Sequence, residues 1–504
     1  MTRKLIYFFS LAVFLSACSP HSRELERALR LAGDNRAELE KVLAHFQHDE
    51  LKLKAAKFLI TNMPYHFSMV EYFRSPTGER YRPDIRLFDN RYDMHDHSNA
   101  LVQRGYQIVR DRLPDITTVN SEFLINNIEL AFKAWQKPWA REISFVDFCK
   151  YILPYRAHIE SLSHLRRYMM ERFTPILKAA NVTTPLEACI VLNEYLRANE
   201  VIRYREVGFP FYPIIDETYQ TGLCACEGMT NLGVFIMRAV GIPVTIDFTI
   251  WARLDLGHSW VAVLNNGIFY SFEPAGTQPI EHRERFSMWN RTPAKVYRRR
   301  FDVVDFYRLK NDDNLVSFLK SPLIQDVTNE YLVPTTTIKV AIDEERYTYQ
   351  SNQIYLMVHN FYQWQPLAMG RRSGSVGIFE NVVGDNIFMV ADSPDGRTLR
   401  LITPPFHVGN EGEIRKFIPQ LQNRITATMN KQHVRVMERH TLYYWDVKAK
   451  RFLPLPYTAV VRTDTTRTYD RIPYNALLWF AAPERTIFNQ RVFFIDDDGS
   501  TRRF

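Results

Sequence analysis

The sequence has little cysteine, and this shortage limits the chemistry that the chain can carry. Five cysteines in 504 residues cannot form the dense disulfide framework of a small secreted protein. Cys224 and Cys226 are closer together than the paired ligands of a common zinc knuckle, and no second Cys/His pair lies near them in the sequence. His258 alone cannot complete such a site, so we expect neither a bound metal nor another cofactor.

The sequence also lacks a long hydrophobic run. The apolar stretch from Leu5 to Ala17 has thirteen residues, fewer than the roughly 20 that a permanent membrane-spanning helix needs. Basic residues before it and small residues after it are typical of a signal peptide over 1–17. The junction Leu15-Ser16-Ala17-Cys18 resembles a bacterial lipobox, in which Cys18 becomes the lipidated first residue, and Ser19 fits delivery to the outer membrane.

We therefore predict an outer-membrane lipoprotein that faces the periplasm or the cell surface and contacts the membrane only through a lipid on Cys18. A plain secretory signal with a chance cysteine is the alternative.

A strong excess of one charge is absent as well. The net charge of +8 is modest for this length, and lysine and arginine are scattered. Their densest cluster, Tyr297 to Arg300, fits one face of a strand or a solvated loop. Because an outer-membrane protein has little access to nucleic acid, we interpret the charge as solvation and expect no nucleic-acid partner.

The hydrophobic pattern changes along the chain and predicts an α+β multidomain protein. Apolar residues recur at helical spacing up to about residue 180, and alternate at strand spacing beyond about residue 335. The stretch 75–97 is predicted as a long irregular loop. The expected divisions are a signal peptide (1–17), a helical domain (18–182), an α+β core (183–290), a connecting segment (291–334), a β-sandwich module (335–415) and a C-terminal β module (416–504).

Cys226 stands at the predicted start of a helix. The apolar-faced segment MTNLGVFIMRAV follows it and ends at Gly241-Ile242-Pro243. A helix N-terminus favours a thiolate, so we expect a lowered thiol pKa and a nucleophilic cysteine. A buried core thiol, or a disulfide with Cys224, is the alternative.

His258 and Glu273 lie on two strands that a short turn can join. Asn266-Gly267 is a strong hairpin signal, and with these two residues in the turn Asn265 pairs with Ile268. Glu273 then lies diagonally across from His258 on the same face, where it can orient the imidazole as the third member of a triad does. A three-residue loop would place the two side chains on opposite faces.

These residues together resemble the transglutaminase-like superfamily of papain-fold cysteine enzymes. The family pattern is a Gly-x-Cys at a helix that ends in Arg-Ala-x-Gly-Ile-Pro, then a His and Trp on one strand and an acid before Pro on the next. The matching segments, which cover roughly 183–277, are Cys226, Arg238 to Pro243, His258-Ser259-Trp260 and Glu273-Pro274. Two positions depart from it: Gly-Leu-Cys-Ala-Cys is longer than Gly-x-Cys, and Glu273 replaces the commoner aspartate.

The resemblance implies a papain-like α+β core with Cys226, His258 and Glu273 as catalytic residues. Gln220, six residues before Cys226, is a candidate oxyanion-hole amide, and the backbone N–H of Cys226 is a second donor. The implied activity is acyl transfer through a thioester, with hydrolysis of an amide or peptide substrate. The alternative is a non-catalytic surface lipoprotein that uses this core as a scaffold and binds protein or glycan, for example through the aromatics of the stretch 360–364.

Overall fold

The computed structural model describes most of the chain beyond its first residues. The described ranges are 20–251, 257–285, 293–305, 315–331, 334–342, 353–360, 363–430, 441–455, 461–462, 466–481 and 491–504. The predicted lipidation site, Cys18, lies outside them, as does the signal segment 1–17. Helices and several separate sheets are both present, which confirms the α+β multidomain class.

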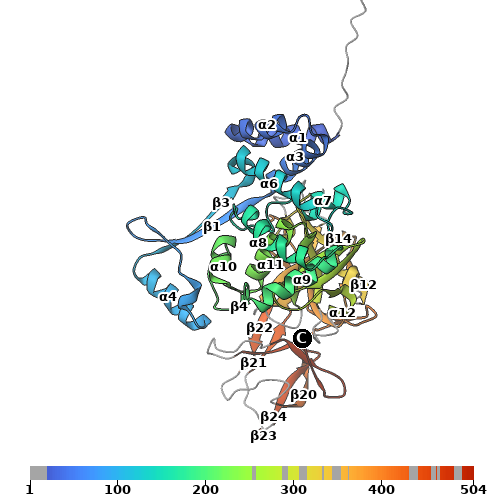
Figure 1. The fold of residues 1–504 in the computed structure, drawn as a ribbon. Helices are drawn as coiled ribbons and strands as arrows, with labels where there is room; N and C mark the ends of the chain where they lie inside the picture. Colours follow the sequence, from blue (N-terminus) through green and yellow to red (C-terminus); the bar gives the residue numbers. More distant parts are fainter. Residues whose placement is uncertain are drawn as a thin grey trace, which may run out of the picture.

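A helical layer occupies one end of the molecule and shares a single apolar core (Figure 1). Side-chain caps fix the starts of two of its helices: Asp49 accepts a hydrogen bond from the Lys52 N–H, and Asn120 from the Phe123 N–H. The helices of this layer are α1 (Pro20–Leu31), α2 (Arg36–His45), α3 (Glu50–Asn62), α6 (Ser121–Trp135) and α7 (Phe145–Tyr151).

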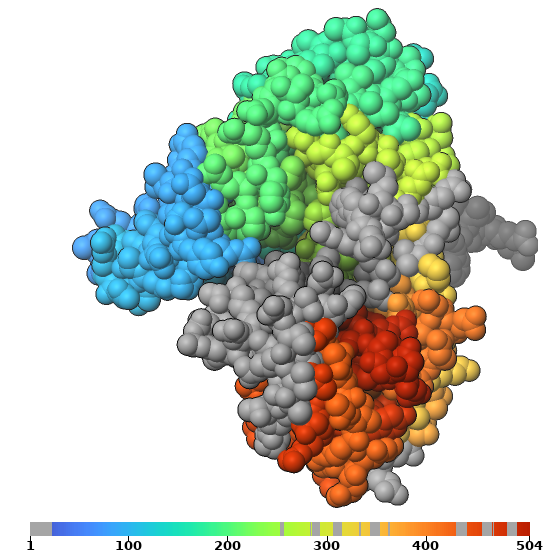
Figure 2. All heavy atoms as spheres, turned by 90° about the horizontal axis from the view of Figure 1, so that it is seen from below, coloured from blue at the N-terminus to red at the C-terminus, as the bar shows by residue number. Residues whose placement is uncertain are grey.

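An arm built on a three-stranded sheet, whose shortest strand is β2 (Arg80–Tyr81), extends from this layer beside the core (Figures 1 and 2). Strand β1 (Phe67–Arg74) pairs antiparallel with β3 (Gln107–Pro114), and helix α4 (Arg91–Gln103) lies near the far end. The irregular loop predicted for 75–97 therefore contains regular structure. Its helix escaped prediction because only Met94 and Leu101 of α4 are buried, which leaves almost no apolar periodicity.

The core is a six-stranded antiparallel sheet with helices packed against it. The strand order is β11-β10-β6-β7-β8-β9, and α11 contacts both β6 and β7. The elements are α8 (Arg166–Ala179), α9 (Pro185–Ala198), α10 (Ile215–Thr221), α11 (Cys226–Ala239), β6 (Val244–Trp251), β7 (Gly257–Asn265), β8 (Ile268–Phe272), β9 (Ile280–Glu281), β10 (Pro293–Arg299) and β11 (Ile324–Asp326). Strands β10 and β11 come from 291–334, for which the sequence suggested only a connecting segment.

Arg298 of the basic cluster is buried, which corrects its interpretation as solvating charge, whereas Arg299 and Arg300 are partly buried. Arg298 is 1% exposed and forms two hydrogen bonds, of 2.9 and 2.8 Å, with the carboxylate of Asp247. Asp247 is the antiparallel partner of Arg298 on β6 and also accepts a hydrogen bond from the Tyr331 hydroxyl at 2.7 Å. The sequence concealed this pairing because the two residues are far apart along the chain.

The C-terminal region is built from strands. One eight-stranded sheet contains β12 (Thr335–Ala341), β13 (Gln353–Asn360), β14 (Gln363–Ser373), β15 (Val376–Val383), β16 (Asn386–Asp392), β17 (Arg400–Leu401), β18 (Phe406–Val408) and β19 (Ile414–Lys416). Two smaller sheets follow, formed by β20 (Gln420–Asn430), β23 (Val461–Arg462) and β24 (Thr466–Tyr474), and by β21 (Thr441–Asp446), β22 (Arg451–Pro454), β25 (Leu478–Ala481), β26 (Phe493–Ile495) and β27 (Thr501–Arg503).

The aromatic stretch proposed to stack on sugars is only partly described. Trp364 packs against Trp445 with 5.9 Å between the ring centres, and belongs to an apolar core shared by the C-terminal sheets. Phe361 and Tyr362 lie outside the described residues. Across the described ranges, no helix has both the length and the apolar character to cross a bilayer.

Candidate active site

Cys226 is the first residue of α11, as the sequence predicted. Helix α10 ends at Gly222, whose positive φ of 66° turns the chain into the short strand β5 (Leu223–Cys224), and Ala225 then caps α11 in an extended conformation. Cys226 is partly exposed, whereas Cys224 is buried. Both are free thiols, so the disulfide weighed for this pair is not formed.

The hairpin that carries His258 and Glu273 has the predicted register. Asn265 pairs with Ile268, and Asn266 and Gly267 form the turn with φ values of 51° and 79°. Beyond the end of β8, the Glu273 N–H donates to Thr277 Oγ1 at 3.2 Å. Glu273 Oε1 lies 2.9 Å from His258 Nε2, so the carboxylate orients the imidazole.

Two tryptophans enclose the imidazole. Trp251 of β6 stacks on the His258 ring with 6.3 Å between centres and 18° between planes. Trp260 of β7 lies 5.9 Å from the same ring and is fully buried, and its indole N–H donates to the Tyr331 hydroxyl at 2.7 Å. Trp260 is therefore a core residue that also limits access of water to His258.

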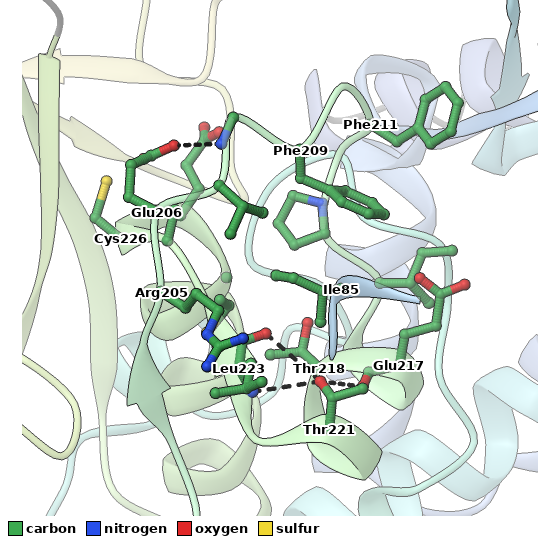
Figure 3. Close-up of a pocket in the computed structure, with 18 of the residues that line it drawn as sticks. Ile85, Arg205, Glu206, Phe209, Phe211, Glu217, Thr218, Thr221, Leu223 and Cys226 are labelled. Atoms are coloured by element: carbon green, nitrogen blue, oxygen red, sulfur yellow. Dashed lines mark hydrogen bonds between the residues drawn. The ribbon is translucent and has the colours of Figure 1, made fainter. Parts of the chain in front are cut away.

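A cavity of about 640 Å³ brings the predicted residues together (Figure 3). Cys226, His258 and Gln220 all line it, whereas Glu273 does not line it and holds His258 from outside. Gln220 is exposed near the end of α10, on the same cavity as the cysteine. Its predicted oxyanion role stays a prediction.

The arm supplies one wall of this cavity, which the sequence did not reveal. Arg82 to Arg86 line the cavity opposite the core. Arg82 anchors this wall because its Nε and Nη2 each lie 2.9 Å from a carboxylate oxygen of Glu217 on α10. It also donates to the Tyr212 carbonyl at 3.2 Å. Arg82 lies in an irregular segment without a motif, so no sequence signal could have found it.

The surroundings of Cys226 raise the pKa of its thiol, contrary to the lowered value expected from the helix N-terminus. Burial is the largest cause, and the negative charge of Glu227 adds to it. Hydrogen bonds from the backbone and hydroxyl of Ser259 oppose the shift. Desolvation and the neighbouring carboxylate therefore raise the thiol pKa more than the Ser259 hydrogen bonds lower it, which favours the neutral thiol at pH 7.

Arg238, the arginine of the family pattern, has a structural role. Its guanidinium is buried and donates to the carbonyls of Tyr151 and Val244 at 3.1 Å and of Arg156 at 2.7 Å. Burial lowers its pKa to about 10. Arg238 thus connects the end of α11 to the start of β6 and to the helical layer. These contacts hold the orientation of α11, the helix that carries Cys226 at its start.

Among the described residues, no group of three or more His, Cys, Asp or Glu side chains is arranged to hold a metal ion.

Two solved structures are similar to this chain at low identity and with low TM-scores. No family model matches the chain, and no curated protein matches it. A solved structure from Cytophaga hutchinsonii, described as a candidate cysteine protease, is similar over 23% of this chain and 40% of its own, with 16% identity and a TM-score of 0.18. Red sea bream transglutaminase is similar over 63% of this chain and 71% of its own, with 10% identity and a TM-score of 0.21. Both scores are low, so the conclusions below depend on the geometry of the site.

Proposed function

We propose that this protein is a transglutaminase-like cysteine enzyme that hydrolyses amide or peptide bonds through a thioester. The observation that carries the proposal is the hydrogen bond of 2.9 Å between His258 and Glu273. His258 lines the same cavity as Cys226, which lies at the start of α11. In this proposal Cys226, the nucleophile, and His258, the base, line the same cavity, and Glu273 orients the base from outside it.

The hydrogen bond between Glu273 and the imidazole supports one route for the proton. Glu273 holds Nε2, so Nδ1 is the nitrogen that accepts the proton of the Cys226 thiol. The sulfur then attacks the amide carbonyl, and the backbone N–H of Cys226 and the amide of Gln220 stabilise the oxyanion. The imidazolium returns the proton to the departing amine. Water, activated by the same histidine, releases the acid from the thioester and restores the thiol.

The neutral resting thiol makes the base essential. Burial and Glu227 raise the thiol pKa, so few molecules carry a thiolate before substrate binds. Proton transfer to His258 must therefore accompany the attack on the carbonyl, and Glu273 stabilises the imidazolium that results.

The wider architecture and location are part of the same proposal. We propose a papain-like core at about 183–290 between a helical domain and C-terminal β modules that bind glycan or protein, with the divisions given by the sequence. Lipidation at Cys18 would anchor the protein to the outer membrane, where the substrate is a surface or periplasmic peptide or a wall-derived amide.

Trapping of the acyl-enzyme tests the proposal. The anchor-free protein is incubated with a panel of peptide amides and activated esters, quenched in acid and digested for peptide mass spectrometry. The expected result is an acyl group on Cys226 alone, lost in Cys226→Ala and accumulated when deacylation is slowed at low pH. Acylation of no cysteine, or equal acylation of Cys149, would favour the non-catalytic binding protein instead.

A further inference from the structure

The charged side chains of the cavity are matched in pairs with one exception. Three of the pairs are Arg82 with Glu217, Arg86 with Asp84 and Arg299 with Glu227. Arg205 is directed toward the arm, where its Nη1 donates to the Phe88 carbonyl at 3.0 Å and lies 4.0 Å from Asp89. Among the described cavity residues, Glu206 is the carboxylate that has no cationic partner.

Glu206 is held in place beside the nucleophile. Its Oε1 accepts a hydrogen bond of 2.8 Å from the Gly208 N–H, and Gly208 has the positive φ of 63° that the turn requires. Figure 3 shows Glu206 and Cys226 next to each other on one side of the cavity, with Arg205 farther along. The electrostatic contribution of Glu206 to the raised thiol pKa of Cys226 agrees with this proximity.

The walls next to this carboxylate are largely apolar. Val207, Phe209 and Phe248 line the cavity, so an aliphatic stem fits along them while its charged end reaches Glu206. Glu206 is exposed in the free protein, and a bound substrate that covers it excludes water, which strengthens the attraction between its carboxylate and the substrate cation.

We propose that Glu206 selects substrates with a positive charge next to the scissile amide, such as peptides with a lysine-like amine near the bond that is cleaved. This inference rests on the proposed function for the identity of the bond. A cation bound at Glu206 also offsets the negative charge near the sulfur, so the preferred substrate assists formation of the thiolate. Neutral and anionic amides lack that assistance.

The rates at which charged thiol reagents modify Cys226 report the electrostatic potential near its sulfur, and this measurement needs no turnover of a substrate. Two methanethiosulfonates of similar size, one cationic and one anionic, are compared at low ionic strength, with the modified position identified by peptide mass spectrometry. Relative to a small free thiol, we expect faster modification by the cationic reagent, and we expect Glu206→Gln to reduce that preference about fivefold. Glutamine keeps the acceptor for the Gly208 N–H, and Glu171→Gln, an exposed change on α8 away from the cavity, is the matched control.

Turnover of cationic, neutral and anionic model amides supplies the second measurement. We expect kcat/KM to be highest for the cationic amide, lower for the neutral amide and lowest for the anionic amide. The advantage of the cationic amide over the neutral one should be reduced in Glu206→Gln and kept in Glu171→Gln. A reagent preference that Glu206→Gln leaves unchanged, or an anionic amide as the best substrate, would overturn the inference while acyl transfer stands. If the reagents show the Glu206-dependent preference but no amide acylates Cys226, the proposed function fails and the site prefers a cationic ligand.

Discussion

Gly233 in the middle of α11 lies directly against the ring of Pro274. A Cβ atom at position 233 would come within 2.3 Å of Pro274 Cγ and 2.6 Å of its Cβ, closer than side chains pack. Pro274 immediately follows Glu273, which orients His258. The close approach of helix and hairpin therefore links the element that carries the nucleophile to the one that carries the acid.

Gly233→Ala is expected to impair catalysis by displacing Glu273. The added methyl must push Pro274 away from α11, and a shift of even 1 Å at a catalytic group costs about 100-fold in rate. The measurement is kcat and KM on an amide substrate, together with the melting temperature. Gly78→Ala is the control for an added methyl without a clash, because no atom lies within 4 Å of the new Cβ there; its φ of 91°, unlike that of Gly233, adds backbone strain. A variant with unchanged kcat would show that this contact does not position Glu273.

Glu273→Gln tests the role of the carboxylate. Glutamine keeps the size of the side chain but loses the charge that stabilises the imidazolium, so we expect kcat to fall by about 10²–10⁴ with little change in KM. A melting temperature equal to that of the wild-type protein separates this effect from simple misfolding. His258→Ala should remove activity to a similar or greater extent, and combining the two changes should add little. Additive losses would mean that the two residues act separately.

The thiol of Cys226 should titrate above its ordinary value of 9.0. Alkylation by iodoacetamide depends on the thiolate, so its rate should be low at pH 7 and still rise above pH 9. Glu227 raises the thiol pKa through its charge, so Glu227→Gln should lower that pKa and speed alkylation at pH 8. The exposed change Glu171→Gln should leave the profile unaltered. Fast alkylation of wild-type Cys226 below pH 7 would instead indicate a resting thiolate–imidazolium pair.

Local patterns predicted those parts of the site that depend on neighbours in the chain. The Asn-Gly dipeptide determined the turn, and period-two alternation on both sides determined the face, so His258 and Glu273 could be paired from sequence. The Gly-Ile-Pro stop located the end of α11 and therefore its start near Cys226. These signals are short-range, and each has one dominant physical cause.

The remaining features depend on contacts between distant segments. The lowered thiol pKa was predicted from the helix dipole alone, whereas burial and the charge of Glu227 raise this pKa, and only the folded structure shows how deep the sulfur lies. The arm residues of the cavity, among them Arg82, come from a stretch with no periodicity. The sequence does not show whether Arg298 is solvated or buried, because its charge is the same in both cases. Its partner Asp247 becomes apparent only when the strands are placed side by side in the sheet.

The buried pair of Arg298 and Asp247 gives the strongest stability prediction. Asp247→Ala would leave the buried guanidinium with only Glu330, a partly exposed carboxylate 2.8 Å away, as its ion-pair partner. It would also remove an acceptor of the Tyr331 hydroxyl, so we expect a loss of about 3 kcal/mol in the free energy of unfolding. The double change Asp247→Leu with Arg298→Met removes both charges and should recover part of that loss. Chemical denaturation measures both variants. Because Tyr331 also accepts the hydrogen bond of Trp260, the single variant should in addition shift tryptophan fluorescence. Equal losses in the single and double variants would mean that cavity formation, and not the loss of the Asp247 charge beside Arg298, dominates the cost.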